Sequence, residues 1–206
     1  MFIAIEGIDG SGKSTQSTRL AEWLEARTGR KTVKTFEPGG WPNGEVMRNF
    51  ILNAPEISPM SELLLFLADR AEHVERVILP ALRQDCNIVC ERWNASTMAY
   101  QAGGHKIPLP QAARIISSCN FPKPDVTILL DIPPETAIAR IESRKNSPDR
   151  FEAEGLAFMR NVASFYRLIA DDDREHFMRI LCDGLAEDEV FAQITAGLEA
   201  RLWQSR

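Results

Sequence analysis

The sequence lacks a pair of cysteines separated by two residues. Its four cysteines form no C-x-x-C motif, which excludes the usual spacing of zinc-binding and dithiol redox sites; they are Cys86, Cys90, Cys119 and Cys182. The N-terminus also lacks the features of a secretory signal peptide. We therefore expect four free thiols and a cytoplasmic location, where thiols stay reduced.

Long apolar runs and surplus positive charge are missing as well. No apolar run approaches the ~20 residues of a membrane-spanning helix, so no membrane partner is expected. The chain carries 24 Lys and Arg against 29 Asp and Glu, a net charge of −5, which argues against a nucleic-acid partner. No repeat or linker divides the 206 residues, and the chain is expected to form one domain, residues 1–206.

What the sequence does contain is a complete phosphate-binding motif. Residues 2–5 form a short apolar run typical of a buried strand, and Gly7-x-x-x-x-Gly12-Lys13-Ser14 follows it directly. A helical pattern begins after the motif. Strand, glycine-rich loop and helix in this order are the context of a P-loop, which binds the phosphates of a nucleotide.

The residue types of this loop explain its chemistry. Gly7, Gly10 and Gly12 allow backbone N–H groups to turn toward one anion. Lys13 brings a full positive charge to the outer phosphates, and the hydroxyl of Ser14 can serve Mg²⁺. The sequence therefore predicts a nucleotide triphosphate site with a magnesium ion.

Strands and helices are expected to alternate along the whole chain. Strands are predicted at 2–5, 32–36, 87–91, 126–131 and 177–181, with helices between them. This order predicts a parallel sheet with right-handed crossovers, whose ligands bind beyond the carboxyl ends of the strands. Polar residues gather at those ends: Asp9, Lys13, Glu37, Glu91, Arg92 and Asp183.

Six spaced motifs resemble one family. They are Gly7 to Ser14, Glu37-Pro-Gly-Gly40, Leu65 to Val74, Glu91 to Gln101, Pro124 to Asp131 and Asp149 to Glu152. Together they are similar to the thymidylate (dTMP) kinases of the bacterial type, from residue 2 to about residue 185. The resemblance implies an α/β fold of the P-loop NTPase class, in three α/β/α layers with a five-stranded parallel sheet, like other nucleoside monophosphate kinases. It also implies transfer of the γ-phosphoryl group of ATP to dTMP, and a homodimer.

The resemblance assigns the donor side of the site. Residues expected to bind ATP are Gly7, Asp9, Gly10, Ser11, Gly12, Lys13, Ser14, Thr15 and Arg140. Mg²⁺ is expected at Ser14 and Glu91, because Glu91 stands where a strand-end carboxylate would hold the ion through water. The turn at residues 183–185 is expected near the adenine.

The resemblance also assigns the acceptor side and the catalytic groups. Residues expected to bind dTMP are Asp9, Glu37, Phe66, Arg70, Arg92, Ser96, Tyr100 and Gln101. Phe66 offers a flat face to the base, Arg70 can donate to a base carbonyl, and Arg92 can grip the acceptor phosphate with two N–H groups. The catalytic groups are expected to be Lys13, Arg92, Arg144, Lys145, Arg150 and Glu91. Gly10 occupies a position where some members carry an arginine, so the basic loop within a closing lid at about residues 141–152 is expected to supply the charge.

Three positions depart from the family pattern. Phe36 stands in place of an arginine, Trp41 in place of a threonine, and Glu91 in place of an aspartate. All three belong to the acceptor and metal side, so a kinase for another pyrimidine monophosphate such as dUMP, or a nucleotide-binding regulator without turnover, stays open as an alternative. The sequence does not decide whether the Glu37–Pro38 bond is cis. Histidines 73, 105 and 176 are expected to be structural or at the surface.

Overall fold

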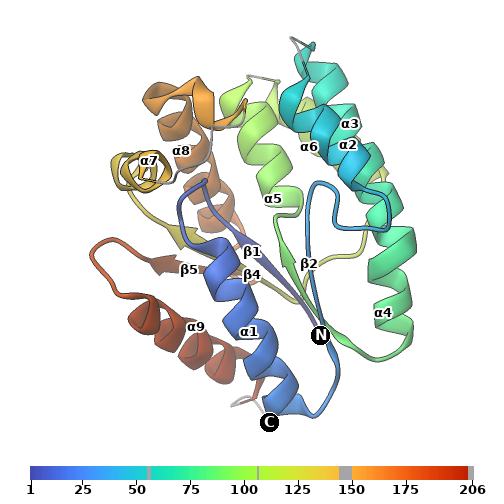
Figure 1. The fold of residues 1–206 in the computed structure, drawn as a ribbon, viewed down its shortest axis with the longest axis vertical. Helices are drawn as coiled ribbons and strands as arrows, with labels where there is room; N and C mark the ends of the chain where they lie inside the picture. The colour runs from blue at the N-terminus through green and yellow to red at the C-terminus, as the bar shows by residue number, and fades with distance from the viewer. Residues whose placement is uncertain (55–56, 106, 144–149, 204–206) are drawn as a thin grey trace.

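The protein forms a five-stranded parallel sheet between two layers of helices. A computed structural model describes residues 1–54, 57–105, 107–143 and 150–203. The strand order is β2-β3-β1-β4-β5, and all neighbours run parallel (Figure 1). The strands are β1 Phe2–Glu6, β2 Thr32–Phe36, β3 Asn87–Glu91, β4 Val126–Asp131 and β5 Phe177–Leu181. The expected fold class and all five strands are confirmed.

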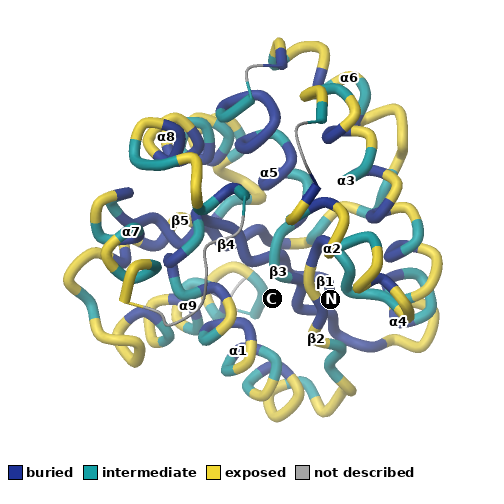
Figure 2. Tube along the Cα trace, turned by 45° about the horizontal axis from the view of Figure 1, so that its top comes forward, coloured by how far each residue is buried: buried dark blue, intermediate teal, exposed yellow. Residues whose placement is uncertain are grey.

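The helices fill the segments between the strands and after the last one, as the sequence pattern predicts. In the described part of the chain they are α1 Lys13–Thr28, α2 Glu45–Asn53, α3 Pro59–His73, a π-helical turn Val74–Ile78, α4 Leu79–Arg83, α5 Asn94–Thr97, a second π-helical stretch Met98–Gly104, α6 Leu109–Ser118, α7 Pro134–Glu142, a short 3₁₀ turn Glu152–Glu154, α8 Leu156–Asp172 and α9 Glu187–Leu202. Figure 2 shows the sheet between α1 and α9 on one side and α3, α5 and α8 on the other. None of the helices in the described ranges has the length and apolar character needed to cross a membrane.

Burial follows the position of each strand in the sheet. Every residue of β1 and β4 is buried, whereas the edge strand β2 has a single buried residue and the edge strand β5 alternates between buried and more exposed positions. A strand with helices on both faces needs an apolar run, and Ile3, Ile5 and Ile128 are fully buried. The three central strands therefore hold their carboxyl ends in a fixed arrangement.

One helix start differs from the expectation. Asn94 is predicted to cap the helix that follows β3, but Trp93 is the capping residue and Asn94 is the first helical residue. The carboxylate of Glu6, at the end of β1, accepts hydrogen bonds from the backbone N–H groups of Trp93 (2.8 Å) and Ser96 (3.1 Å). A side chain far away in the sequence thus performs the capping, and the Asn94 side chain accepts a hydrogen bond from Arg70 instead.

Candidate functional site

Three adjoining pockets form one cleft at the carboxyl ends of the strands. The aromatic pocket, of about 540 Å³, is lined by Asp9, Glu37, Pro38, Arg48, Leu52, Phe66, Arg70, Arg92, Ser96, Thr97, Tyr100, Gln101 and Phe151. The central channel, of about 1110 Å³, is lined by the P-loop together with Lys34, Phe36, Glu37, Arg48, Glu91, Arg92 and Glu152. The outer pocket, of about 770 Å³, lies between the P-loop and Arg140, Cys182, Leu185, Glu187 and Val190.

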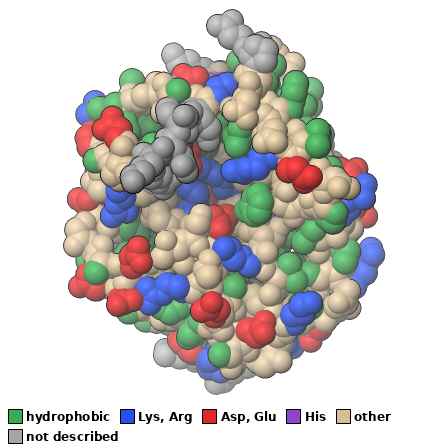
Figure 3. Space-filling view, in the orientation of Figure 1, with side chains coloured by type: hydrophobic (Ala, Val, Ile, Leu, Met, Phe, Trp, Pro, Cys, Tyr) green, Lys and Arg blue, Asp and Glu red, His purple; other side chains and the backbone are tan. Residues whose placement is uncertain are grey.

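Shared lining residues show that the pockets are continuous. Asp9, Glu37, Arg48 and Arg92 line both the aromatic pocket and the central channel. The P-loop in turn lines both the channel and the outer pocket. Figure 3 shows Lys and Arg side chains gathered around a hollow on this face of the molecule. The basic surface that phosphates require is therefore local, although the whole chain is acidic.

The P-loop holds Lys13 in a defined position. Lys13 is buried, and its Nζ donates to the carbonyl oxygens of Gly7 and Ile8, both at 2.9 Å. Burial and the nearby positive charge of Arg92 lower the pKa of Lys13 to about 8, against the opposing effect of Asp9. The buried hydroxyl of Ser11 has no hydrogen-bond partner among the described residues. The loop thus holds a cation and a free polar group at the start of α1.

Two glycines of this loop are required by close approach and by backbone conformation. Gly10 has φ +82°, and a Cβ at this position would lie 2.6 Å from the carbonyl oxygen of Ala137 in α7. Gly7 has φ +142°, and its Cβ would lie 2.6 Å from the carbonyl oxygen of Leu130. In this chain the loop therefore packs so closely against β4 and α7 that a Cβ at either glycine would force the backbone to shift.

Ser14 and Glu91 lie together at the edge of the central channel. The Ser14 hydroxyl donates to Glu91 Oε2 at 2.7 Å, and the Ser17 hydroxyl donates to Oε1 at 2.6 Å. In the described ranges no group of three or more His, Cys, Asp or Glu side chains could hold a metal ion by itself. One carboxylate and one hydroxyl are a small set of hard oxygen ligands, which fits an ion that keeps water and phosphate oxygens in its shell, as Mg²⁺ does.

Arg92 lies between the channel and the aromatic pocket. Its backbone adopts the left-handed conformation, with φ 67°, and its guanidinium forms an ion pair with Asp9. Asp9 also accepts a hydrogen bond from the Tyr100 hydroxyl at 2.8 Å. Although burial opposes it, the charges of Arg92 and Lys13 hold the pKa of Asp9 well below its usual range. Asp9 therefore stays ionised and orients Arg92.

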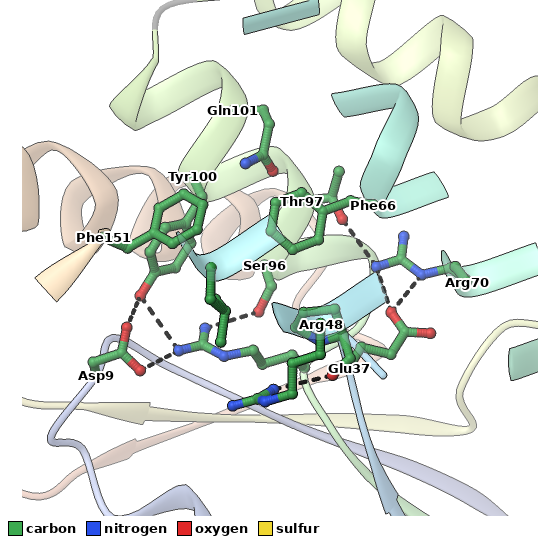
Figure 4. Close-up of a pocket in the computed structure, with 13 residues that line it drawn as sticks. Asp9, Glu37, Arg48, Phe66, Arg70, Ser96, Thr97, Tyr100, Gln101 and Phe151 are labelled. Atoms are coloured by element: carbon green, nitrogen blue, oxygen red, sulfur yellow. Dashed lines mark hydrogen bonds and ion pairs between the residues drawn. The ribbon is translucent and has the colours of Figure 1, made fainter. Parts of the chain in front are cut away.

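The aromatic pocket has the shape and chemistry of a base-binding site. The rings of Phe66 and Phe151 lie 5.9 Å apart between centroids, and Tyr100 lies 5.7 Å from Phe151 at a nearly perpendicular angle. Figure 4 shows these rings around the opening, with the amide end of Gln101 directed toward Phe66 and Thr97. A flat, apolar-sided slot with a few polar groups is suited to a planar heterocycle.

Arg70 is fixed at the floor of this pocket. Its Nε donates to Glu37 Oε2 at 2.7 Å, and its other nitrogens donate to Asn94 Oδ1 and Thr97 Oγ1. Nη2 also lies 2.7 Å from Glu37 Oε2, so described residues use most of the guanidinium N–H groups. The remaining N–H groups can donate to a ligand, since Arg70 lines the pocket.

Two expected ligand-binding residues have mainly a supporting position. Glu37 is buried and binds Arg70 and, through Oε1 at 2.9 Å, His73. Ser96 donates to the carboxylate of Glu6 and forms a hydrogen bond of 2.7 Å with Tyr166. Both residues line the aromatic pocket, but their hydrogen bonds hold other residues of the site in place.

The expected donor-side and lid residues have different outcomes. Arg140 lines the outer pocket and donates to the carbonyl oxygen of Gly10 at 3.2 Å. Arg150 forms an ion pair of 2.6 Å with Glu62 and donates to the carbonyl oxygen of Ile51, next to the aromatic pocket. A role in the transfer step requires Arg150 to leave Glu62, and it stays a prediction. Arg144 and Lys145 lie outside the described residues.

The departures from the family pattern affect the site in unequal ways. Trp41 is expected to add bulk at the acceptor mouth; instead its indole N–H donates to Asp69 at 2.8 Å, and it lines none of the three pockets. Phe36 does line the central channel, and its ring lies 5.4 Å from the guanidinium of Arg48. The Glu37–Pro38 bond is cis.

Sequence reasoning missed several lining residues. Arg48 lines both the aromatic pocket and the channel, and Thr97 and Phe151 line the aromatic pocket. Arg48 lies on α2, which follows the Pro- and Gly-rich loop after β2. A basic residue just after a strand-end loop is the one sequence signal that could have predicted its place in the site. Phe151 belongs to the motif Asp149 to Glu152, of which only Arg150 was selected.

Comparisons with known proteins identify the relatives of this chain. A family model described as thymidylate kinase matches residues 5–194. A thymidylate kinase of Chlorobaculum tepidum is 40% identical, with 97% of each chain covered. One from Synechococcus sp. (strain JA-2-3B'a(2-13)) is 38% identical over 98% of this chain and 96% of the relative. The crystal structure of thymidylate kinase from Ehrlichia chaffeensis has a TM-score of 0.78 at 31% identity, covering 97% of this chain and 98% of that one.

Proposed function

The chain belongs to the thymidylate kinase family, and from this premise we propose how its own residues transfer the γ-phosphoryl group of ATP to dTMP to give dTDP. The single observation that carries the proposal is the continuous cleft. It joins a base-sized aromatic pocket to a P-loop through a channel with basic residues on its walls. Two anionic nucleotides can therefore lie in line with their phosphates facing each other, which is the main requirement of phosphoryl transfer.

The donor nucleotide occupies the outer pocket and the P-loop. Arg140 and Leu185 border the adenine, and the amides of the loop with Lys13 hold the outer phosphates. Lys13 exchanges its carbonyl partners for phosphate oxygens, and Thr15, which lines both the channel and the outer pocket, contacts the inner phosphate. In this assignment the loop amides, Lys13 and Thr15 together neutralise the charge of the donor phosphates.

The acceptor nucleotide occupies the aromatic pocket. Its base lies against Phe66, with Arg70 donating to a base carbonyl and Gln101 at the base edge. Its phosphate points into the channel, where Arg92 and Arg48 lie. Tyr100 closes the sugar side together with Asp9, and the two are joined by a hydrogen bond.

Phosphoryl transfer then needs charge neutralisation more than covalent chemistry. Arg92 and Lys13 lie beside the same carboxylate, because Asp9 Oδ1 is paired with Arg92 and lies 3.8 Å from Lys13 Nζ. Mg²⁺ would be held by Ser14 and Glu91 and would neutralise charge on the donor phosphates. We assign the arrival of further positive charge to the lid at residues 141–152, with Arg144, Lys145 and Arg150 as its basic residues.

The proposal extends to assembly and location. Val46, Phe50 and Leu64 are large apolar side chains that remain exposed on α2 and α3, which fits a homodimer packed through these helices. A purified chain should sediment with the mass of two copies; a mass of one copy at micromolar concentration would contradict it. The four cysteines are all free, in keeping with a cytoplasmic enzyme.

The test is an acceptor panel. Purified protein with ATP and Mg²⁺ is offered dTMP, dUMP, dCMP, UMP and AMP, and ADP release is followed. We expect turnover on dTMP to exceed that on each other acceptor by at least about tenfold in kcat/KM, which corresponds to about 1.4 kcal/mol. A preference for dUMP or another pyrimidine would show that Phe36 reshapes the acceptor side. ATP binding without turnover on any acceptor would identify a regulator.

A further inference from the structure

We propose that Glu62 is a positioning residue that fixes the orientation of the Gln101 amide, so that the aromatic pocket selects bases with an N–H donor at the ring nitrogen facing Gln101. The imide of thymine or uracil has such a donor, and neutral cytosine has an acceptor there. The inference rests on the proposed function, because it assumes that a pyrimidine lies against Phe66 with its edge toward Gln101.

The side chain of Glu62 is buried within a ring of donors. It is 1% exposed and lies in the first turn of α3. Oε1 accepts from Gln101 Nε2 at 2.9 Å and from His105 Nδ1 at 2.6 Å, and Oε2 lies 2.6 Å from Arg150. None of these contacts lies in the P-loop or the central channel. Phosphoryl transfer as proposed therefore assigns no role to Glu62.

The charge of Glu62 decides which way the amide of Gln101 points. Burial opposes ionisation, but the hydrogen bonds from His105 and Gln101 outweigh it and lower the pKa of Glu62. An ionised carboxylate has no proton to donate and can only accept. Gln101 must therefore present its NH₂ group to Glu62. In the flipped amide, the carbonyl oxygen of Gln101 would face the carboxylate of Glu62, and both are acceptors.

The carbonyl end of Gln101 is then left for the ligand. Gln101 Oε1 is buried and has no hydrogen-bond partner among the described residues. Gln101 lines the aromatic pocket, and its amide end is directed toward Phe66 and Thr97 (Figure 4). A buried acceptor without a partner is costly, and a ligand N–H removes that cost.

The chemistry of the pyrimidines makes this a selective contact. Thymine and uracil carry a hydrogen on N3, which can donate to Gln101 Oε1. Cytosine has a lone pair on N3, so two acceptors would face each other next to the buried Gln101 amide. Mismatches of this kind are rejected more strongly than differences of size, because buried polar groups are left unpaired.

The experiment measures ratios of kcat/KM rather than activity alone. In Glu62→Gln the carboxamide can donate or accept, so Gln101 can flip and offer its NH₂ group to cytosine N3. We expect the ratio of dTMP to dCMP to fall about tenfold or more, while the ratio of dTMP to dUMP stays within about twofold because both bases carry the imide. A purely structural loss would lower kcat/KM for all three acceptors in parallel, and that outcome would overturn the proposal.

A double-mutant cycle tests whether Glu62 acts through Gln101. Glu62→Gln is repeated in a Gln101→Ala background, where no amide remains to be oriented. The dTMP to dCMP ratio should then change by less than about twofold; a change as large as in the wild-type background would show that Glu62 acts by another route. Glu72→Gln, which removes an exposed charge from the same helix, is the matched control and should leave both ratios unchanged.

A structure of the wild-type protein with dTMP keeps the proposal testable if Glu62→Gln does not fold. Gln101 Oε1 should lie within about 3.2 Å of N3 of the base, with Nε2 still on Glu62. A base whose N3 donates elsewhere would overturn the inference. Failure of the proposed function itself would be visible separately, as an absence of turnover by the wild type on all three acceptors.

Discussion

At the residue scale, the cations of the cleft are already paired before a nucleotide arrives. Lys13 binds two carbonyl oxygens, Arg92 binds Asp9, and Arg70 binds Glu37. Buried charges without partners are costly, so these pairs make a preformed phosphate site possible in a chain of net charge −5. Lys13 can exchange its neutral carbonyl partners for charged phosphate oxygens, which bind an ammonium group more strongly.

The lowered pKa of Lys13 predicts how ATP binding depends on pH. The amine has an ordinary pKa near 10.5 and a pKa of about 8 in the free protein, so it loses its proton as the pH rises through about 8. Phosphates bind the charged form, so ATP binding above this pH must be accompanied by proton uptake. The Kd of a non-hydrolysable ATP analogue should be nearly constant below about pH 7.5 and rise up to about tenfold per pH unit above about pH 8.

Titration calorimetry in two buffers of different ionisation enthalpy measures this uptake directly. The proton uptake should approach one proton for each ATP analogue bound at about pH 9. Lys13→Met should bind weakly and show no such uptake, which assigns the proton. A Kd that is unchanged between about pH 7.5 and 9.5 in the wild type would contradict a lowered pKa for Lys13.

From spacing alone, residue identities in the site were predictable only where they are local, and the family resemblance was needed for Phe66, Arg70 and Gln101. Lys13, Ser14 and the glycines of the P-loop follow from spacing, because consecutive residues build that loop. Arg48 and Glu62 were not found, because their positions depend on contacts with segments far away in the sequence. Trp41 was expected at the acceptor mouth because of its place in the family pattern, but its indole N–H donates to Asp69 on α3.

At the element scale, the starts of α1 and α5 lie at the site, and each depends on another element. The start of α5 is capped by Glu6 of β1, and the loop before α1 packs on Ala137 of α7. Burial raises the pKa of Glu6, against the lowering effect of its hydrogen bonds with Ser96. Element bounds were well predicted from periodicity and turn residues, but the cap of α5 could not be, since a distant strand provides it.

The close approach between the P-loop and α7 gives a prediction with a matched control. Gly10→Ala introduces both a left-handed alanine and a clash with the Ala137 carbonyl, and should lower the free energy of unfolding by about 2–4 kcal/mol. Gly29→Ala, at φ +68° with no neighbouring atom, should cost only about 1–2 kcal/mol. Urea unfolding measures both values.

The same two variants should differ in nucleotide binding. Gly10→Ala displaces the loop that lines the channel and should weaken ATP binding, whereas Gly29 lies at the far end of α1 and its substitution should not. Equal losses of stability for both variants would show that the P-loop can move away from α7 without cost.

At the scale of the whole molecule, five of the six sequence motifs contribute residues to one cleft at the carboxyl ends of the parallel strands. β1 and β3 end side by side, so the P-loop, Glu91 and Arg92 meet there, while α3 and the π-helical stretch after α5 form the walls of the aromatic pocket. The sheet and the meeting of these motifs were predictable, because parallel strands end at a common edge. The division of the cleft into three connected pockets was not, because side chains from many segments shape it.

The most direct test that donor and acceptor bind in separate, connected pockets follows the labelled phosphoryl group from one nucleotide to the other. With γ-³²P-labelled ATP, Mg²⁺ and dTMP, the label should appear in dTDP, one label for each ADP formed. Without dTMP, release of labelled inorganic phosphate should be at least about a hundredfold slower, because the acceptor pocket is empty and water is not positioned for attack. Release of inorganic phosphate at the same rate with and without dTMP, with no label in dTDP, would contradict the account.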